Sequence, residues 1–86
     1  MIHKIYTIYD SKAEAYLPPF FMHQQGMALR TFTDCVNDPN HAFGKHPEDY
    51  TLFNAGIFDD DLGTITQDKL ESVANGLTLV QQEENQ

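Results

Sequence analysis

The sequence has little positive charge. Five Lys or Arg stand against thirteen Asp or Glu among 86 residues, for a net charge of −8. Nonspecific binding to a phosphate backbone depends on clustered cations that release counterions, so the composition argues against a protein that coats nucleic acid unaided. Four of the five cations lie within the first 45 residues. Two arrangements therefore remain: the cations form a locally basic face, or they are scattered and solvated.

Cysteine is nearly absent, and long apolar runs are missing. The single Cys35 cannot form an internal disulfide, which suits a reducing compartment. No run approaches the roughly 20 apolar residues of a membrane span, and the N-terminus lacks an apolar core followed by a small-residue cleavage site. We expect a protein without a membrane segment that stays in the cytoplasm where it is made.

Apolar residues are nevertheless plentiful enough for one small core. They make up 41% of the chain and include six Phe and four Tyr. A chain of this length buries only about 60% of its unfolded surface and is marginal as a monomer. We expect a single domain over residues 1–80, a polar, frayed tail over 81–86, and assembly as a homodimer.

The first half of the chain predicts two strands and a helix. Residues 2–9 are β-branched and aromatic with apolar side chains on both faces, which is typical of a central strand. Residues 16–22 contain two prolines and predict an edge strand or a strand broken at its start. Residues 25–37 predict a helix. Its apolar face comprises Ala28, Leu29, Phe32, Cys35 and Val36.

The second half predicts a hairpin and an ambiguous C-terminal segment. Strands over 50–59 and 63–66 flank a turn that Gly63 closes in left-handed geometry, and Gly56 indicates a bulge or a close backbone approach. The spacing of Leu70, Val73 and Ala74 suggests a short helix, with a last strand over 77–80. The predicted fold is α+β: a two-layer domain with one helix packed on an antiparallel sheet, in the order β-β-α-β-β.

Metal and catalytic sites find little support. An EF-hand loop starting at Asp59 would need Gly and Glu at its sixth and twelfth positions, where this chain has Thr64 and Leu70. His3, His23, His41, His46 and Cys35 lack the close ligand pairs of a structural zinc site. Cys35 lies on the apolar face of the helix, as a core hydrophobe would. We predict no enzyme activity, no metal and no cofactor.

Aromatic side chains are a stronger lead, since single-stranded nucleic acid can stack its bases on them beside modest positive charge. For Phe20, Phe32, Phe53 and Phe58 we expect a place in the core. The tyrosines at strand edges are better stacking platforms. The candidate contacts to nucleic acid are Lys4, Tyr6, Tyr9, Lys12, Tyr16, Arg30 and Lys45.

Several segments occur in an order that resembles a viral family. They are residues 6–16, 19–21, 26–32, 36–39, 46–53 and 56–60. Over roughly residues 4–65 the chain resembles the small nonstructural protein of gokushovirus-type microviruses, which are tailless icosahedral phages with a circular single-stranded DNA genome. The resemblance implies a small phage factor, made in the infected bacterium, that serves the switch toward single-strand synthesis and packaging. It brings no catalytic residues.

Two hypotheses follow. In the first, the chain binds a phage or host replication protein or a procapsid protein, and the acidic hairpin tip of Asp59, Asp60 and Asp61 meets a basic partner. In the second, it binds single-stranded DNA directly through the face that carries Tyr6, Tyr9 and Tyr16, with Lys and Arg as phosphate contacts.

Overall fold

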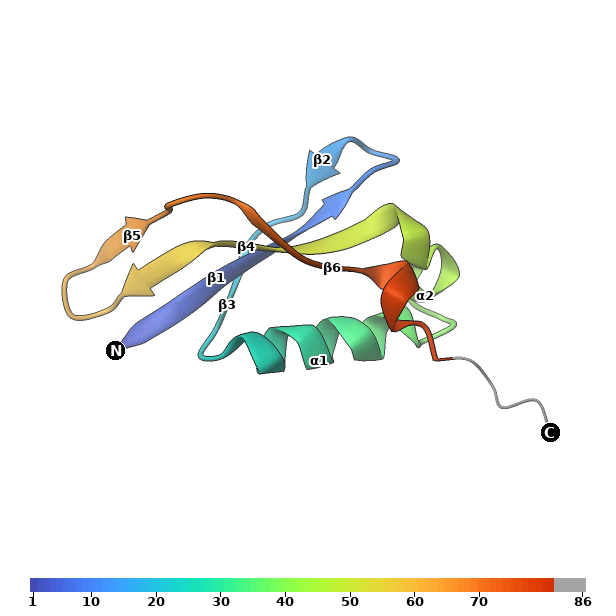
Figure 1. The fold of residues 1–86 in the computed structure, drawn as a ribbon, viewed down its shortest axis with the longest axis horizontal. Coiled ribbons are helices and arrows are strands. Elements are labelled where there is room, and N and C mark those ends of the chain that lie inside the picture. Colours follow the sequence, from blue (N-terminus) through green and yellow to red (C-terminus); the bar gives the residue numbers. More distant parts are fainter. Residues whose placement is uncertain (82–86) are drawn as a thin grey trace.

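A nine-residue strand near the N-terminus forms the centre of the sheet. In the computed structural model, which describes residues 1–81, β1 (Ile2–Asp10) pairs antiparallel with β4 (Tyr50–Asp59) along its whole length (Figure 1). The other side of β1 pairs with β2 (Ala15–Tyr16) and β3 (Phe20–Met22). Residues 5–8 are all buried. The predicted central strand with apolar side chains on both faces is therefore confirmed.

The prolines divide the strand predicted over residues 16–22. Pro18 and Pro19 lie between β2 and β3 and have no N–H to donate to the ladder. The Leu17 backbone still donates to the Ile8 carbonyl at 2.8 Å, which keeps the connection against β1. The predicted edge position is confirmed, and so is a break at the prolines, which leaves two short strands.

The predicted helix is α1 (Gln25–Val36). Ala28, Phe32 and Val36 are buried at the expected spacing. The helix starts without a side-chain cap at Gln24 and ends at Asn37. The Asn37 amide donates to the Thr33 and Leu79 carbonyls, and its oxygen accepts from the Gln81 backbone at 2.7 Å. Asn37 thus ties the helix end to the C-terminal segment.

Two short helices connect α1 to the hairpin. They are α2 (Ala42–Lys45) and the 3-10 helix η1 (Pro47–Asp49). His41 caps α2 by accepting from the Phe43 N–H at 3.0 Å. Proline suits the first position of η1 because its missing N–H would have no helical partner.

The hairpin joins β4 to β5 (Thr64–Thr66). Gly63 closes the turn with φ +69°, the left-handed geometry that glycine adopts without steric cost. Gly56 has φ +135°, and the β1–β4 register shifts beside it so that Ala55 is an extra residue. The predicted bulge is confirmed.

The C-terminal segment differs from the prediction. The expected helix over 70–74 is a strand, β6 (Glu71–Asn75), and the expected last strand over 77–80 is the 3-10 helix η2 (Gly76–Leu79). β6 pairs with the first half of β4, whose backbone groups would otherwise lack partners on that side. Asn75 then turns the chain: its amide donates to Thr51 Oγ1 at 2.9 Å, and its oxygen accepts from the Leu77 N–H.

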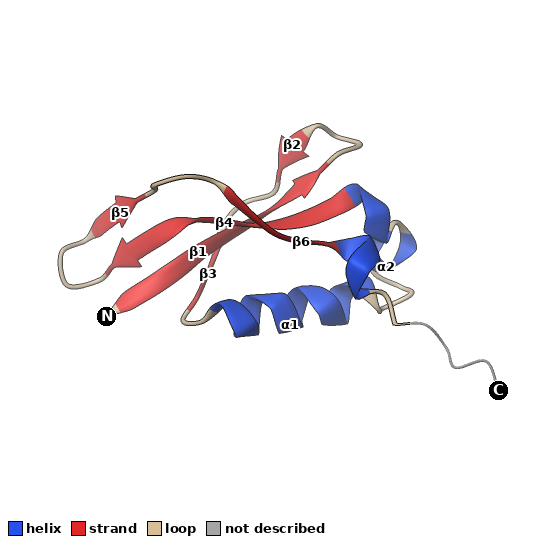
Figure 2. Cartoon of the chain, viewed as in Figure 1, coloured by secondary structure: helices blue, strands red, loops and turns tan. Residues whose placement is uncertain are grey.

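The strands form a six-stranded antiparallel sheet with helices on one side only (Figure 2). β2 and β3 follow each other along β1, and β6 and β5 along β4, so the sheet is four strands wide at both ends. The core under α1 consists of Tyr6, Ile8, Ala28, Phe32, Val36 and Leu52. No helix within residues 1–81 is long and apolar enough to cross a bilayer. The predicted tail over 81–86 lies outside the described residues, apart from Gln81.

Candidate functional site

The face of the sheet turned away from α1 is the candidate site. Directly paired residues of an antiparallel sheet project to the same face, and the core residues Tyr6, Ile8 and Leu52 identify the helix side. The residues of opposite register define what we call the open face. They are His3, Ile5, Thr7, Tyr9, Tyr16, Phe21, Thr51, Phe53, Gly56, Phe58, Ile65, Ser72 and Asn75. None of the thirteen is Asp, Glu, Lys or Arg.

Aromatic rings at one end of the open face form a contact chain. The ring centroids of Tyr9 and Tyr16 are 4.7 Å apart, and those of Tyr16 and Phe53 are 5.7 Å apart. Tyr16 is 49% exposed. Because the rings support one another, this end presents an aromatic surface whose conformation is already fixed.

The other end of the open face is hollowed. His3, Phe21, Phe58 and Ile65 line an apolar depression of about 300 Å³. Phe21 packs edge-on against Phe58 with centroids 5.9 Å apart, and the His23 ring lies 4.8 Å from His3. Phe21 is 49% exposed and Ile65 66%. These side chains keep apolar area in contact with water in the monomer, and a complex that covered them would gain free energy by burying it.

The floor between the two ends is closed. Ile5 and Thr7 are buried, each 6% exposed. The Thr7 hydroxyl donates to the Leu17 carbonyl at 2.7 Å, so its polar group is satisfied within the sheet. The most exposed side chains of the open face are therefore Tyr16, Phe21 and Ile65, together with Ser72 of β6, and the Thr7 hydroxyl at its centre is satisfied.

The acidic hairpin tip borders the hollow. Asp60 Oδ2 lies 2.8 Å from His3 Nε2, and Oδ1 lies 2.7 Å from the Met1 amino group. The amino group, and then His3, hold the pKa of the Asp60 carboxyl below its usual value. The Asp59 carboxylate accepts from the backbone N–H of Asp61 at 2.9 Å and so stabilises the turn. Of the three predicted partner contacts, Asp61 is the most exposed, at 82%.

One predicted nucleic-acid contact is wrong. Tyr6 has no exposed surface, so no base can stack on it. It projects to the helix side, opposite Tyr9, since successive residues of a strand alternate between faces. Burial raises the pKa of Tyr6, against a smaller opposing effect of the Asn54 side chain, and the hydroxyl makes no hydrogen bond with any described residue. Tyr6 is a core residue.

The predicted cations are not gathered around the remaining tyrosines. Lys4 pairs with Met22 and Ile57 in the register of the helix side. Arg30 lies on α1 and Lys45 on α2. Lys12 alone of the four lies near the stacked tyrosines, in the turn that joins β1 to β2.

The phenylalanines expected in the core divide between the two faces. Phe32 is buried, and Phe20 packs against the core. Phe53 and Phe58 lie on the open face instead, which corrects the prediction. Residues five apart project to opposite faces of a regular strand, but the extra residue Ala55 brings these two to the same face.

Cys35 lines a second apolar hollow of about 320 Å³ between α1 and the sheet. Its thiol is half-buried rather than fully buried. Burial, and then the charges of Asp34 and Asp38, raise the pKa of the thiol. Because the thiolate is the nucleophile, this environment makes Cys35 less reactive than an ordinary cysteine.

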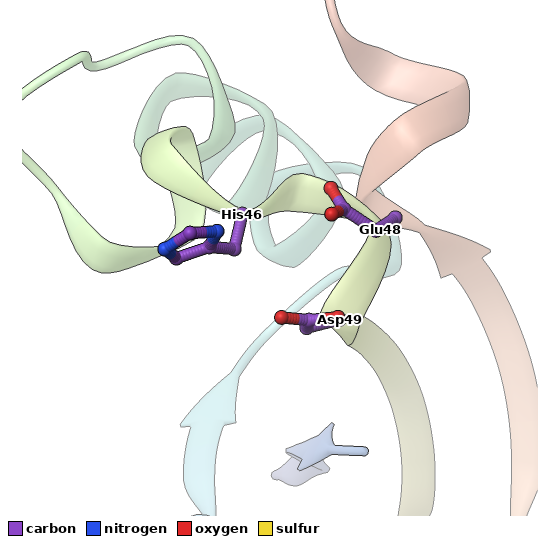
Figure 3. Close-up of side chains that lie close together, drawn as sticks. All are labelled: His46, Glu48 and Asp49. Atoms are coloured by element: carbon purple, nitrogen blue, oxygen red, sulfur yellow. The ribbon is translucent and has the colours of Figure 1, made fainter. Parts of the chain in front are cut away.

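The only close histidine–carboxylate group with three members in the described part of the chain lies at η1. Ligand atoms of His46, Glu48 and Asp49 are within 4.8 Å of one another, with Asp49 turned toward His46 (Figure 3). His46 and Glu48 are exposed. A closed structural zinc site has four ligands, commonly including cysteine, so this group does not fit one.

Comparison with known proteins identifies the lineage. The family described as Phage ORF5 protein matches residues 3–79. The chain belongs to the Phage ORF5 family. It is 37% identical over 62 residues to Protein ORF5 of Chlamydia phage 1, a gokushovirus-type microvirus. The alignment covers 67% of this chain and 65% of that protein. The predicted resemblance is therefore confirmed, and the chain is a microvirus protein. No solved structure matches it.

Proposed function

We propose that this Phage ORF5 protein is a non-enzymatic accessory factor in the synthesis or packaging of the single-stranded DNA genome. It acts in the cytoplasm of the host bacterium by binding a replication or procapsid protein. The observation that carries the proposal is the open face, which combines exposed aromatic side chains with an absence of formal charge. Apolar surfaces of this kind mark protein interaction sites.

The two ends of the open face have different roles in such a complex. The hollow beside Phe21 and Phe58 accepts an apolar side chain, as the anchor pockets of protein interfaces do. Asp60 and Asp61, at its border, favour a partner with Lys or Arg next to that anchor. Charge at the rim chiefly accelerates encounter and selects the partner, while the buried anchor supplies most of the affinity.

Gel filtration with purified replication-initiation and procapsid proteins of the same phage tests the proposal. We expect a complex with one of them at about 10 µM, a concentration suited to transient interfaces. Phe21→Glu places a charge in the hollow and should abolish the complex. Met27→Glu makes the same kind of change at a similarly exposed apolar residue of α1 and should leave it intact. No complex, or equal loss in both variants, would refute the proposal.

Direct binding of single-stranded DNA is a second candidate, supported by the ring chain of Tyr9, Tyr16 and Phe53. Stacking of a base on an aromatic ring contributes about 1–3 kcal/mol. Lys12, in the adjoining turn, is the cation placed to contact a phosphate. With so few cations, binding should depend only weakly on salt, with a slope of about one to three phosphates.

Fluorescence anisotropy of a labelled oligonucleotide distinguishes this candidate. Titrations at about 50 and 200 mM salt measure the electrostatic contribution. If DNA is a ligand, Tyr16→Ala should weaken binding at least fivefold, whereas Tyr50→Ala, which lies on the helix side, should change it far less when the variant is folded. No saturable binding at tens of micromolar would eliminate this candidate.

A further inference from the structure

Two copies of the chain can cover each other's open face. The face is largely apolar and four strands wide at both ends, and it lies opposite the helices. We infer that the free protein is a homodimer in which two open faces pack together, with α1 of each copy on the outside. This goes beyond the proposed function, because it concerns the chain in the absence of any phage or host partner.

The absence of charged side chains makes this surface suitable for self-association. Each copy carries a net charge of −8, and juxtaposed like charges oppose binding. The thirteen residues of the open face include no Asp, Glu, Lys or Arg. At the border, Asp60 is already compensated by the Met1 amino group and His3. Face-to-face packing therefore brings two acidic chains together with little direct repulsion.

The available area approaches what a stable dimer needs. The six strands contain 32 residues, and at about 3.3 Å per residue and 4.8 Å per strand they cover about 500 Å² of sheet. Side-chain relief increases the accessible area toward the roughly 800 Å² per partner of a standard interface. Exposed Tyr16, Phe21 and Ile65 lie within this area. Aromatic anchors of this type dominate the energetics of interfaces.

The geometry is one that sheets commonly adopt. Two sheets pack face to face about 10 Å apart, with strand directions about 30° from parallel. A two-fold axis that lies in the plane between the two sheets, parallel to both, makes the same patch contact itself, as in most homodimers. Within residues 1–81, the core beneath α1 contains six buried apolar side chains, so burying the second face substantially enlarges the apolar interior of the assembly.

Sedimentation velocity on the full chain tests the dimer. Between about 1 and 100 µM, the range over which a moderate interface assembles, we expect a species of twice the 9.8 kDa chain mass. Phe21→Glu and, separately, Ile65→Glu should shift the dissociation constant upward at least tenfold. Met27→Glu on α1 should shift it less than twofold. Circular dichroism shows whether each variant is folded.

Each outcome is decisive for the dimer. A monomeric wild-type chain at 100 µM (about the upper end of that range) would overturn the inference, as would a folded Ile65→Glu variant that dimerises like the wild type. A monomer that still forms the complex with a phage protein would overturn the dimer and leave the proposed function standing. A dimer that no phage or host partner dissociates or joins would support the dimer while refuting the proposed function.

Discussion

The two faces of the sheet are built from the same strands but have opposite relations to solvent. The helix side is closed by α1 and has Tyr6 and Leu52 with no exposed surface. The open face carries as many aromatic rings, yet Tyr16 and Phe21 remain half-exposed. Apolar content therefore does not distinguish the two faces. The difference lies in what covers them, and the uncovered face is where binding would bury apolar area.

The comparison also separates structural from binding residues of the same type. Phe32 on α1 and Phe21 on β3 are chemically identical, and so are Tyr6 and Tyr16. In each pair, the first stabilises the fold of one chain and the second is available to another molecule. Substitution of matched residues on the two faces therefore tests the assignment directly.

The largest effect is expected from Phe32→Ala. Phe32 is 2% exposed in the core beneath α1, and truncating such a side chain costs about 3–5 kcal/mol in the free energy of unfolding. Phe21→Ala should cost less than about 1.5 kcal/mol, because half of that side chain already contacts water. Urea unfolding at low protein concentration, where dimerisation contributes least, measures both. Equal losses would contradict the distinction between the faces.

The bulge that aligns the open face should be the next most sensitive point. Gly56→Ala forces a side chain into φ +135° and against the Thr66 carbonyl of β5. We expect a loss of about 1–3 kcal/mol and reduced binding, since Phe53 and Phe58 share a face only through this bulge. Gly26→Ala on α1 meets open space and should be neutral or stabilising by up to about 1 kcal/mol. Thermal unfolding compares the two, and a neutral Gly56→Ala would show that the bulge tolerates a side chain.

A smaller effect, of opposite sign, is expected at the buried tyrosine. The Tyr6 hydroxyl is buried without a hydrogen bond to any described residue, and an unsatisfied buried group costs about 1–3 kcal/mol. Tyr6→Phe should therefore raise the melting temperature by a few degrees. Tyr16→Phe, on the open face, should leave it unchanged. A clear loss of stability in Tyr6→Phe would mean that the hydroxyl has a partner.

The smallest effect is expected at the border of the open face. The Met1 amino group and His3 lower the pKa of Asp60 in the folded chain. The carboxylate therefore stabilises the fold above its ordinary pKa of 3.8, and this contribution disappears as the pH falls through the lowered folded value.

Melting temperatures at about pH 7 and pH 2 test this linkage. Asp60→Asn should be slightly less stable than the wild type at neutral pH, and the difference should vanish in acid. Asp61→Asn, whose side chain is 82% exposed, provides the matched control. A difference for Asp60→Asn that is the same at both pH values would show that the loss is not electrostatic.

Local patterns predicted much of the fold. The apolar run of β1, the spacing of Ala28, Phe32 and Val36 in α1, and glycine at the hairpin turn each depend on near neighbours in the chain. Even the bulge had a local signal in Gly56. The family resemblance, confirmed over residues 3–79, likewise followed from the order of short segments.

Predictions failed where a distant strand supplied the deciding contacts. The spacing of Leu70, Val73 and Ala74 fits a helix, but the free edge of β4 offered a ladder of hydrogen bonds and the segment became β6. Phe53 and Phe58 were expected in the core because the sequence shows that they are apolar. It does not show on which face of the sheet they lie. In each case the local preference is small compared with the tertiary contacts that override it.

The candidate site separates what local sequence determines from what tertiary packing determines. Successive side chains of a strand project to opposite faces, so the spacing of three residues already places Tyr6 and Tyr9 on opposite faces of β1. Only the tertiary structure decided which face α1 would cover, and so which tyrosine would be buried and which exposed. The physical reason is range: alternation depends on adjacent residues, whereas burial depends on the packing of segments far apart in the chain.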